Sequence, residues 1–122
     1  LVIYGELVFN QECIDLPFLK ESAVVVSKTM KDEEVGCIYN DGMLESVFYK
    51  IPTKWAQIAF FTGWELDLLV NISKQEKTAY WFGFEAINEI INKGGRFRVF
   101  EPEEGRAVDI DSSYDLKLLE KI

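Results

Sequence analysis

One turn signal constrains the fold of this chain more than any other feature. Asn40-Asp41-Gly42 separates two segments, 33–39 and 43–49, in which apolar and polar residues alternate. Alternation with a period of two is typical of a strand buried on one face, and Asp-Gly is a preferred pair in the tight type I′ turn of a hairpin. The sequence therefore predicts two neighbouring antiparallel strands in the middle of the chain.

The rest of the chain mixes short apolar segments with helical patterns. Strands are expected at 1–9, 23–26, 55–61, 96–100 and 107–110. A helical pattern runs through 10–21, although Pro17 forces that helix to start late. Further helices are expected at 63–73 and 83–93, with a last one beginning near Ser113. Strands with interspersed helices favour an α/β fold, here a mixed and mostly parallel sheet with flanking helices, from which the β-hairpin is an excursion.

The helix ends and one polar loop give more local expectations. Thr62 precedes the helix at 63–73, and Glu65 follows it at the spacing of a capping box. The pair Gly94-Gly95 predicts the stop of the helix at 83–93. The acidic stretch 31–34 is expected to be a solvated loop.

Composition limits the class of protein and of partner. The 122 residues are 48% hydrophobic, which suits a single domain with one core, and no apolar run is long enough to cross a bilayer. The net charge of -8 argues against nucleic acid or an anionic membrane as a partner. Cys13 and Cys37 are in no CxxC pattern and are expected to be buried, reduced thiols, which favours a cytoplasmic protein.

Two carboxylates near the end of the chain suggest a metal site. Asp109 and Asp111 lie two residues apart on an expected short strand, so their side chains point to the same face. Carboxylate oxygens are the ligands that a divalent cation such as Mg²⁺ prefers. From the spacing alone the pair is either half of a metal site or two solvated acids where a strand meets a helix.

Several motifs taken together resemble a known family. They are an apolar strand ending in Gly5-Glu6, the central hairpin, the segment Phe-Glu-x-Ile-Asn-Glu-Ile-Ile at 84–91, the glycine pair, and Asp-Ile-Asp-Ser-x-x-Asp-Leu at 109–116. In this order they resemble the C-terminal half of a GT-A-like nucleotidyltransferase, in particular a cytidylyltransferase or a sugar-phosphate nucleotidyltransferase. The resemblance implies that 1–122 is a single domain forming the C-terminal portion of a larger one, with the back half of a Rossmann-like fold.

The resemblance also implies a magnesium site. The family's first strand usually ends in Gly-Asp, and that Asp holds the catalytic Mg²⁺; here Glu6 stands at this position. The family's other metal-binding carboxylates correspond to Asp109 and Asp111. The expected ligands of Mg²⁺ are therefore Glu6, Asp109 and Asp111.

Three further residues receive roles in substrate binding or catalysis. Lys54 lies where the family has a basic residue near the phosphates, and Glu85 matches an acidic helix residue near the acceptor. Trp81, in an aromatic cluster at 80–84, is a candidate for contact with the acceptor, since aromatic rings with Glu85 beside them can hold a quaternary ammonium. The alternative for the cluster is packing between sheet and helix.

The implied reaction transfers a nucleoside monophosphate from a CTP-like nucleoside triphosphate to a phosphorylated small molecule and releases pyrophosphate. The alternative is a non-catalytic relative with a binding or regulatory role, because Glu6 replaces Asp. The family's glycine-rich nucleotide loop has no counterpart in these residues, so we expect the N-terminal half of the same protein as a partner and the 122 residues alone to be inactive. An exposed sheet edge would favour pairing with another chain and is compatible with a homo-oligomer.

Overall fold

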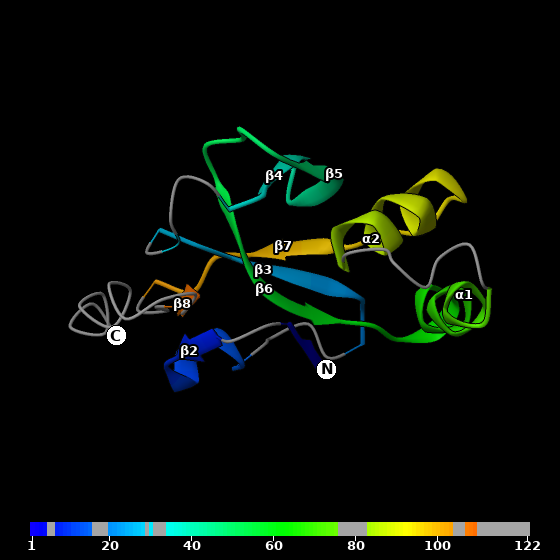
Figure 1. Ribbon diagram of the computed structural model, residues 1–122, viewed down its shortest axis with the longest axis horizontal. Coiled ribbons are helices and arrows are strands. Elements are labelled where there is room, and N and C mark those ends of the chain that lie inside the picture. Colours follow the sequence, from blue (N-terminus) through cyan, green and yellow to red (C-terminus); the bar gives the residue numbers. More distant parts are fainter. Residues whose placement is uncertain are drawn as a thin grey trace.

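Strands dominate the regular structure of this protein. The computed structural model describes residues 1–4, 7–15, 20–28, 30, 34–75, 83–103 and 107–109. Within them lie the strands β1 (Val2–Ile3), β2 (Leu7–Phe9), β3 (Ala23–Ser27), β4 (Gly36–Asn40), β5 (Met43–Phe48), β6 (Lys54–Phe60), β7 (Arg98–Phe100) and β8 (Ala107–Asp109). The helices are the 3-10 turn η1 (Gln11–Cys13) and the α-helices α1 (Gly63–Ser73) and α2 (Gly83–Asn92) (Figure 1).

Five strands close into a mixed barrel. Their order is β6-β3-β7-β5-β4, and a bridge between Gly36 of β4 and Lys54 of β6 completes the ring. β1 pairs with β6 outside this ring, while β2 and β8 form a separate antiparallel pair. Figure 1 shows α1 and α2 toward one end of the long axis of the molecule and the β2–β8 pair toward the other end.

The expected Rossmann-like, mostly parallel sheet with flanking helices is therefore wrong. Among the described strands only β3 and β7 pair in parallel, and every other pairing between them is antiparallel. A parallel sheet needs a crossover between successive strands, usually a helix. Here β4, β5 and β6 follow one another without a helix, so the hairpin is part of the barrel wall and not an excursion from a sheet.

The N-terminal prediction also fails in part. The expected strand at 1–9 is two strands in two different sheets, and their residues are half-buried or exposed. The chain leaves one sheet and enters the other between Tyr4 and Leu7. The late-starting helix expected in 10–21 falls largely on residues 16–19, which lie outside the described part; before them the chain forms η1. The helix expected from Ser113 lies outside the described residues.

The hairpin prediction is confirmed. β4 and β5 pair in antiparallel fashion with Asn40 opposite Met43, which leaves a two-residue turn. Asp41 and Gly42 both have positive φ, 52° and 74°, as a type I′ turn requires. The expected strands at 23–26 and 55–61 and the two helices that follow them are also present.

Side chains of β3 alternate between two hydrophobic clusters. Val24 and Val26 lie in the larger cluster, together with residues of the other barrel strands and of α1 and α2. Val25 lies in a smaller cluster that includes Leu7, Phe9 and Ala107 of β2 and β8. Apolar burial thus holds the β2–β8 pair against β3 on the face opposite to the larger cluster. Neither α-helix in the described part of the chain meets the length and hydropathy that a membrane span requires.

Asn88 of α2 completes the edge of β5. Its side-chain amide accepts a hydrogen bond from the Val47 N–H at 2.8 Å and donates one to the Val47 carbonyl at 2.7 Å. We expect Asn88→Ala to lower the free energy of unfolding by about 2 kcal/mol, since two partly buried backbone groups lose their partner. Denaturant unfolding measures this loss. Asn92→Ala, an exposed asparagine of the same helix, is the matched control, and an equal loss in both variants would contradict the assignment.

Cys37 is a buried thiol, as the sequence predicts. Burial raises the pKa of this thiol from 9.0 to about 12. Since the thiol ionises near its ordinary pKa only in the unfolded chain, the unfolding free energy is expected to fall as the pH rises from 9 toward 12, by up to about 1.4 kcal/mol per pH unit. Denaturant unfolding of the wild type and of Cys37→Ala at pH 8 to 11 tests this. The variant should lose less stability over that range, and identical slopes would refute the assignment.

Candidate functional site

Tyr4 lies at the centre of the region to which the sequence assigns function. It follows β1 and directly precedes Gly5-Glu6. Its ring packs edge-on against Trp55, with ring centroids 5.2 Å apart, and lies so close to Gly83 that a Cβ there would overlap it. Burial raises the pKa of the Tyr4 phenol above its ordinary value, so the hydroxyl remains protonated at neutral pH. The start of α2 and the end of β1 are therefore in direct contact.

A bulge in β6 holds the backbone at Tyr4. The Tyr4 N–H donates to the Gln57 carbonyl at 2.9 Å, and Gln57 has a φ of 63°. A left-handed conformation costs a residue other than glycine about 1 kcal/mol, and such strain concentrates at functional sites. The Gln57 amide donates to Glu34 Oε2 at 2.9 Å. Glu34, expected in a solvated loop, is instead half-buried and hydrogen-bonded at this bulge.

Lys54, the first residue of β6, also contacts Glu34. Its side chain is buried, and its Nζ donates to the backbone carbonyl of Glu34 at 3.2 Å. Lys54 lies opposite Ser27 of β3 and bridges to Gly36 of β4. The Lys54 amine thus makes a hydrogen bond within the protein. To contact a phosphate, the role expected from the sequence, it would have to turn away from the Glu34 carbonyl.

The β2–β8 pair brings two of the predicted metal-binding segments together. Leu7 lies opposite Asp109 in this pair. Because Leu7 directly follows Glu6, the backbone beside Glu6 is opposite the backbone of Asp109. Glu6, Asp111 and the side chain of Asp109 lie outside the described part of the structure. The described side chains alone contain no group of three metal-binding residues.

Glu85 lies in the first turn of α2, two residues after Gly83, and is half-buried. The contact between Gly83 and Tyr4 therefore joins the Glu85 turn to the segment that carries Glu6. Phe84 of the predicted aromatic cluster packs against Phe48 and Tyr49, at centroid distances of 6.2 and 5.5 Å. This contact supports the packing role for Phe84, while Trp81 lies outside the described residues.

The structure brings the predicted segments together in two separate contacts, one around Tyr4 and one in the β2–β8 pair, while Gly5 and Glu6 between them lie outside the described residues. Tyr4 contacts the start of α2, its backbone is bonded to the bulge that adjoins Lys54, and Leu7 pairs with Asp109. Sequence reasoning missed Tyr4, Glu34 and Gln57. No pattern in the sequence distinguishes Gln57 from an ordinary strand residue, because its left-handed backbone depends on a bulge formed with a distant strand.

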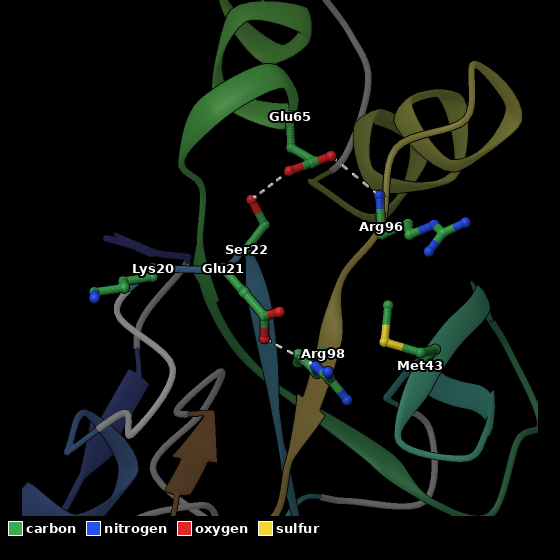
Figure 2. Close-up of a pocket in the computed structure, with 7 residues that line it drawn as sticks. All are labelled: Lys20, Glu21, Ser22, Met43, Glu65, Arg96 and Arg98. Atoms are coloured by element: carbon green, nitrogen blue, oxygen red, sulfur yellow. Dashed lines mark hydrogen bonds and ion pairs between the residues drawn. The ribbon is translucent and has the colours of Figure 1, made fainter.

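A pocket of about 330 Å³ lies at the other end of β3 (Figure 2). None of the predicted site residues lines it; the lining residues are Lys20, Glu21, Ser22, Met43, Glu65, Arg96 and Arg98. Ser22 directly precedes β3, whereas Lys54 lies opposite the last residue of that strand. Five strand residues separate the two places by about 16 Å.

The two carboxylates at this pocket already have partners within the protein. Glu65 accepts from the Ser22 hydroxyl at 3.1 Å and from the Arg96 N–H at 3.2 Å, and Glu21 pairs with Arg98 at 2.9 Å. In Figure 2 the Lys20 side chain points away from the hollow. Thr62 begins α1 but makes no side-chain cap, so the expected capping box with Glu65 is wrong. Glu65 instead ties α1 to β3 and to the segment before β7.

Comparison with known proteins finds a likeness in fold. The sequence matches no protein-family model, and no curated protein matches it. Among solved structures, the chain is similar to the inositol-1-phosphate CTP transferase from T. maritima. The TM-score is 0.64 and the sequence identity is 14%, over 95% of this chain and 52% of that chain.

This chain therefore has a fold similar to about half of a nucleotidyltransferase. It spans about half the length of the solved protein. At 14% identity the similarity is one of fold. The activity and the substrates of this protein are therefore matters for a proposal.

Proposed function

We propose that this chain is part of a nucleotidyltransferase that uses a CTP-like nucleoside triphosphate and a phosphorylated small-molecule acceptor. The observation that carries the proposal is the similarity in fold to a CTP transferase over nearly the whole chain. An acceptor phosphate oxygen attacks the α-phosphorus of the nucleotide, the bond from that phosphorus to the bridging oxygen breaks, and pyrophosphate leaves. The N-terminal half of the intact protein would bind the nucleotide.

The metal in this proposal is Mg²⁺, held by Glu6, Asp109 and Asp111. The pairing of Leu7 with Asp109 supports this choice, since it brings the two carboxylate-bearing segments together at one end of β2–β8. Carboxylate oxygens suit Mg²⁺, which binds one or two of them and keeps water and phosphate as its other ligands. When bound, the metal neutralises charge on the phosphate oxygens.

Residues near Tyr4 are proposed to bind the phosphorylated acceptor. Glu85, in the half-buried first turn of α2, is proposed to contact the acceptor, with Trp81 beside it. The close packing of Tyr4 on Gly83 fixes this turn against the segment that leads to Glu6. Lys54 is proposed as the basic residue near the phosphates. In-line phosphoryl transfer depends mainly on positioning and charge, and this arrangement supplies both without a histidine.

Pyrophosphate release by the intact protein, from CTP and a panel of phosphorylated acceptors, tests the proposal. We expect release that depends on both the acceptor and Mg²⁺. Calorimetry with Mn²⁺ in the presence of CTP separates the enzyme from its alternative. A protein that binds neither metal nor nucleotide would favour the non-catalytic relative.

A further inference from the structure

The bulge in β6 is built by more interactions than pairing in the sheet requires. β3 pairs with Ile58 through Val25 and with Trp55 through Val26, so Ala56 and Gln57 are extra residues on β6. The Trp55 indole N–H donates to the Ile58 carbonyl at 3.1 Å across this bulge. The Gln57 amide donates to Glu34, and Lys54 donates to the Glu34 carbonyl. Three side chains thus hold the bulge in one shape.

The N-terminal segment changes sheets at this point. β1 pairs with β6 as far as the hydrogen bond from the Tyr4 N–H to the Gln57 carbonyl. Beyond Gly5-Glu6 the chain pairs with β8. The Tyr4 ring also packs on Trp55, at the other end of the bulge. The bulge therefore contacts the last described residue before Glu6 through both its backbone and its side chain.

The side chain of Gln57 makes a hydrogen bond at a position where the backbone favours glycine. With a φ of 63°, this position suits glycine, and any other residue is strained there. A glutamine is favourable only if its side chain contributes something that glycine cannot. The contribution seen in the structure is the hydrogen bond to Glu34. Bulges are frequent beside active sites, where they redirect a side chain.

We propose that Gln57 and Glu34 are positioning residues that hold Tyr4 on β6, and that Mg²⁺ binding by Glu6, two residues farther along the chain, depends on this hold. This inference rests on the proposed function, in which Glu6 is a ligand of Mg²⁺. Neither residue touches substrate or metal in this account. Gln57 acts through the backbone of Tyr4, and Glu34 acts by holding Gln57.

The test uses Gln57→Gly in the intact protein, because this variant removes the strain and the side chain together. Hydrogen exchange should show about tenfold lower protection of the Tyr4 amide, with the β4–β5 amides unchanged. The half-saturating Mg²⁺ concentration for pyrophosphate release should rise about tenfold, as for other residues that orient metal ligands. Glu34→Ala should give the same two effects, and the double variant little more than either single one.

Asp41→Gly is the matched control, since Asp41 has a φ of 52° in the hairpin turn, away from Tyr4. It should leave both measurements unchanged. Unchanged Tyr4 protection in Gln57→Gly would overturn the positioning role. Lower protection with an unchanged Mg²⁺ requirement would overturn the link to the metal. If the wild type releases no pyrophosphate, the proposed function fails, while Tyr4 exchange still decides whether Gln57 and Glu34 position this segment.

Discussion

Replacing Asp109 with asparagine in the intact protein is expected to lower turnover by about 10²–10³-fold. The substitution keeps the size of the side chain and removes the charge that the proposal assigns to Mg²⁺ binding. A loss of this size is typical when one electrostatic contact to the transition state is removed. The backbone of Asp109 ends β8 opposite Leu7, which follows the second proposed ligand, Glu6, in the sequence.

Steady-state pyrophosphate release at saturating CTP and acceptor measures this loss. Asp67→Asn, an exposed carboxylate on α1, is the matched control and should keep wild-type turnover. Both variants should have the melting temperature of the wild type, which separates a lost metal ligand from a lost β2–β8 pair. Turnover of Asp109→Asn within a few-fold of wild type would exclude Asp109 from the metal site.

Gly36→Ala is expected to be the most destabilising single substitution in the barrel. A Cβ at this position would lie 2.5 Å from the Ile51 carbonyl oxygen, 2.6 Å from that of Thr53 and 2.7 Å from the Ile51 Cβ. These are mainly backbone atoms, so no rotamer change can relieve the overlap. Gly36 also carries the bridge to Lys54 that closes the ring of strands. We expect a loss of about 3 kcal/mol or more in the free energy of unfolding.

Denaturant unfolding compares this variant with Gly42→Asn. Gly42 lies in the hairpin turn, a Cβ there would meet open space, and asparagine tolerates its φ of 74°. The control should lose less than about 1 kcal/mol. If Gly36→Ala were as stable as the control, the close approach of β4 to the segment before β6 would be wrong.

The sequence predicted local elements well because their signals are local. The Asp41-Gly42 turn follows from the need for two positive φ angles, and the end of α2 from Gly94, whose φ is 96°. The stripe of Ile87 and Ile90 marks the buried face of α2. These features depend on residues a few positions apart, so the chain itself shows them.

The overall architecture was not predicted, because it depends on pairings between distant residues. Closure of the barrel includes a bridge between Gly36 and Lys54, and the hydrogen bond from Tyr4 to β6 is made at the bulge that contains Gln57. Neither has a local signal. The assumption of parallel strands failed because β4, β5 and β6 follow one another without a crossover helix.

The candidate site lies between these two cases. Glu6, Asp109 and Glu85 could be selected from sequence motifs. In the structure, Tyr4 contacts Gly83, near Glu85 in the sequence, and Leu7 pairs with Asp109. The supporting residues could not be selected. Glu34 belongs to an acidic stretch that is typical of a solvated loop, and only the fold brings it to Gln57.

Transfer of label from [α-³²P]CTP to a phosphorylated acceptor by the intact protein tests the central claim most directly. The account predicts a labelled product that forms only when acceptor and Mg²⁺ are both present, in an amount equal to the pyrophosphate released. The Asp109→Asn variant should form this product about 10²–10³-fold more slowly. CTP, other nucleoside triphosphates and a range of phosphorylated acceptors should all be supplied. If the protein binds CTP and Mg²⁺ but transfers no label to any acceptor, it is not a nucleotidyltransferase, and the account is contradicted.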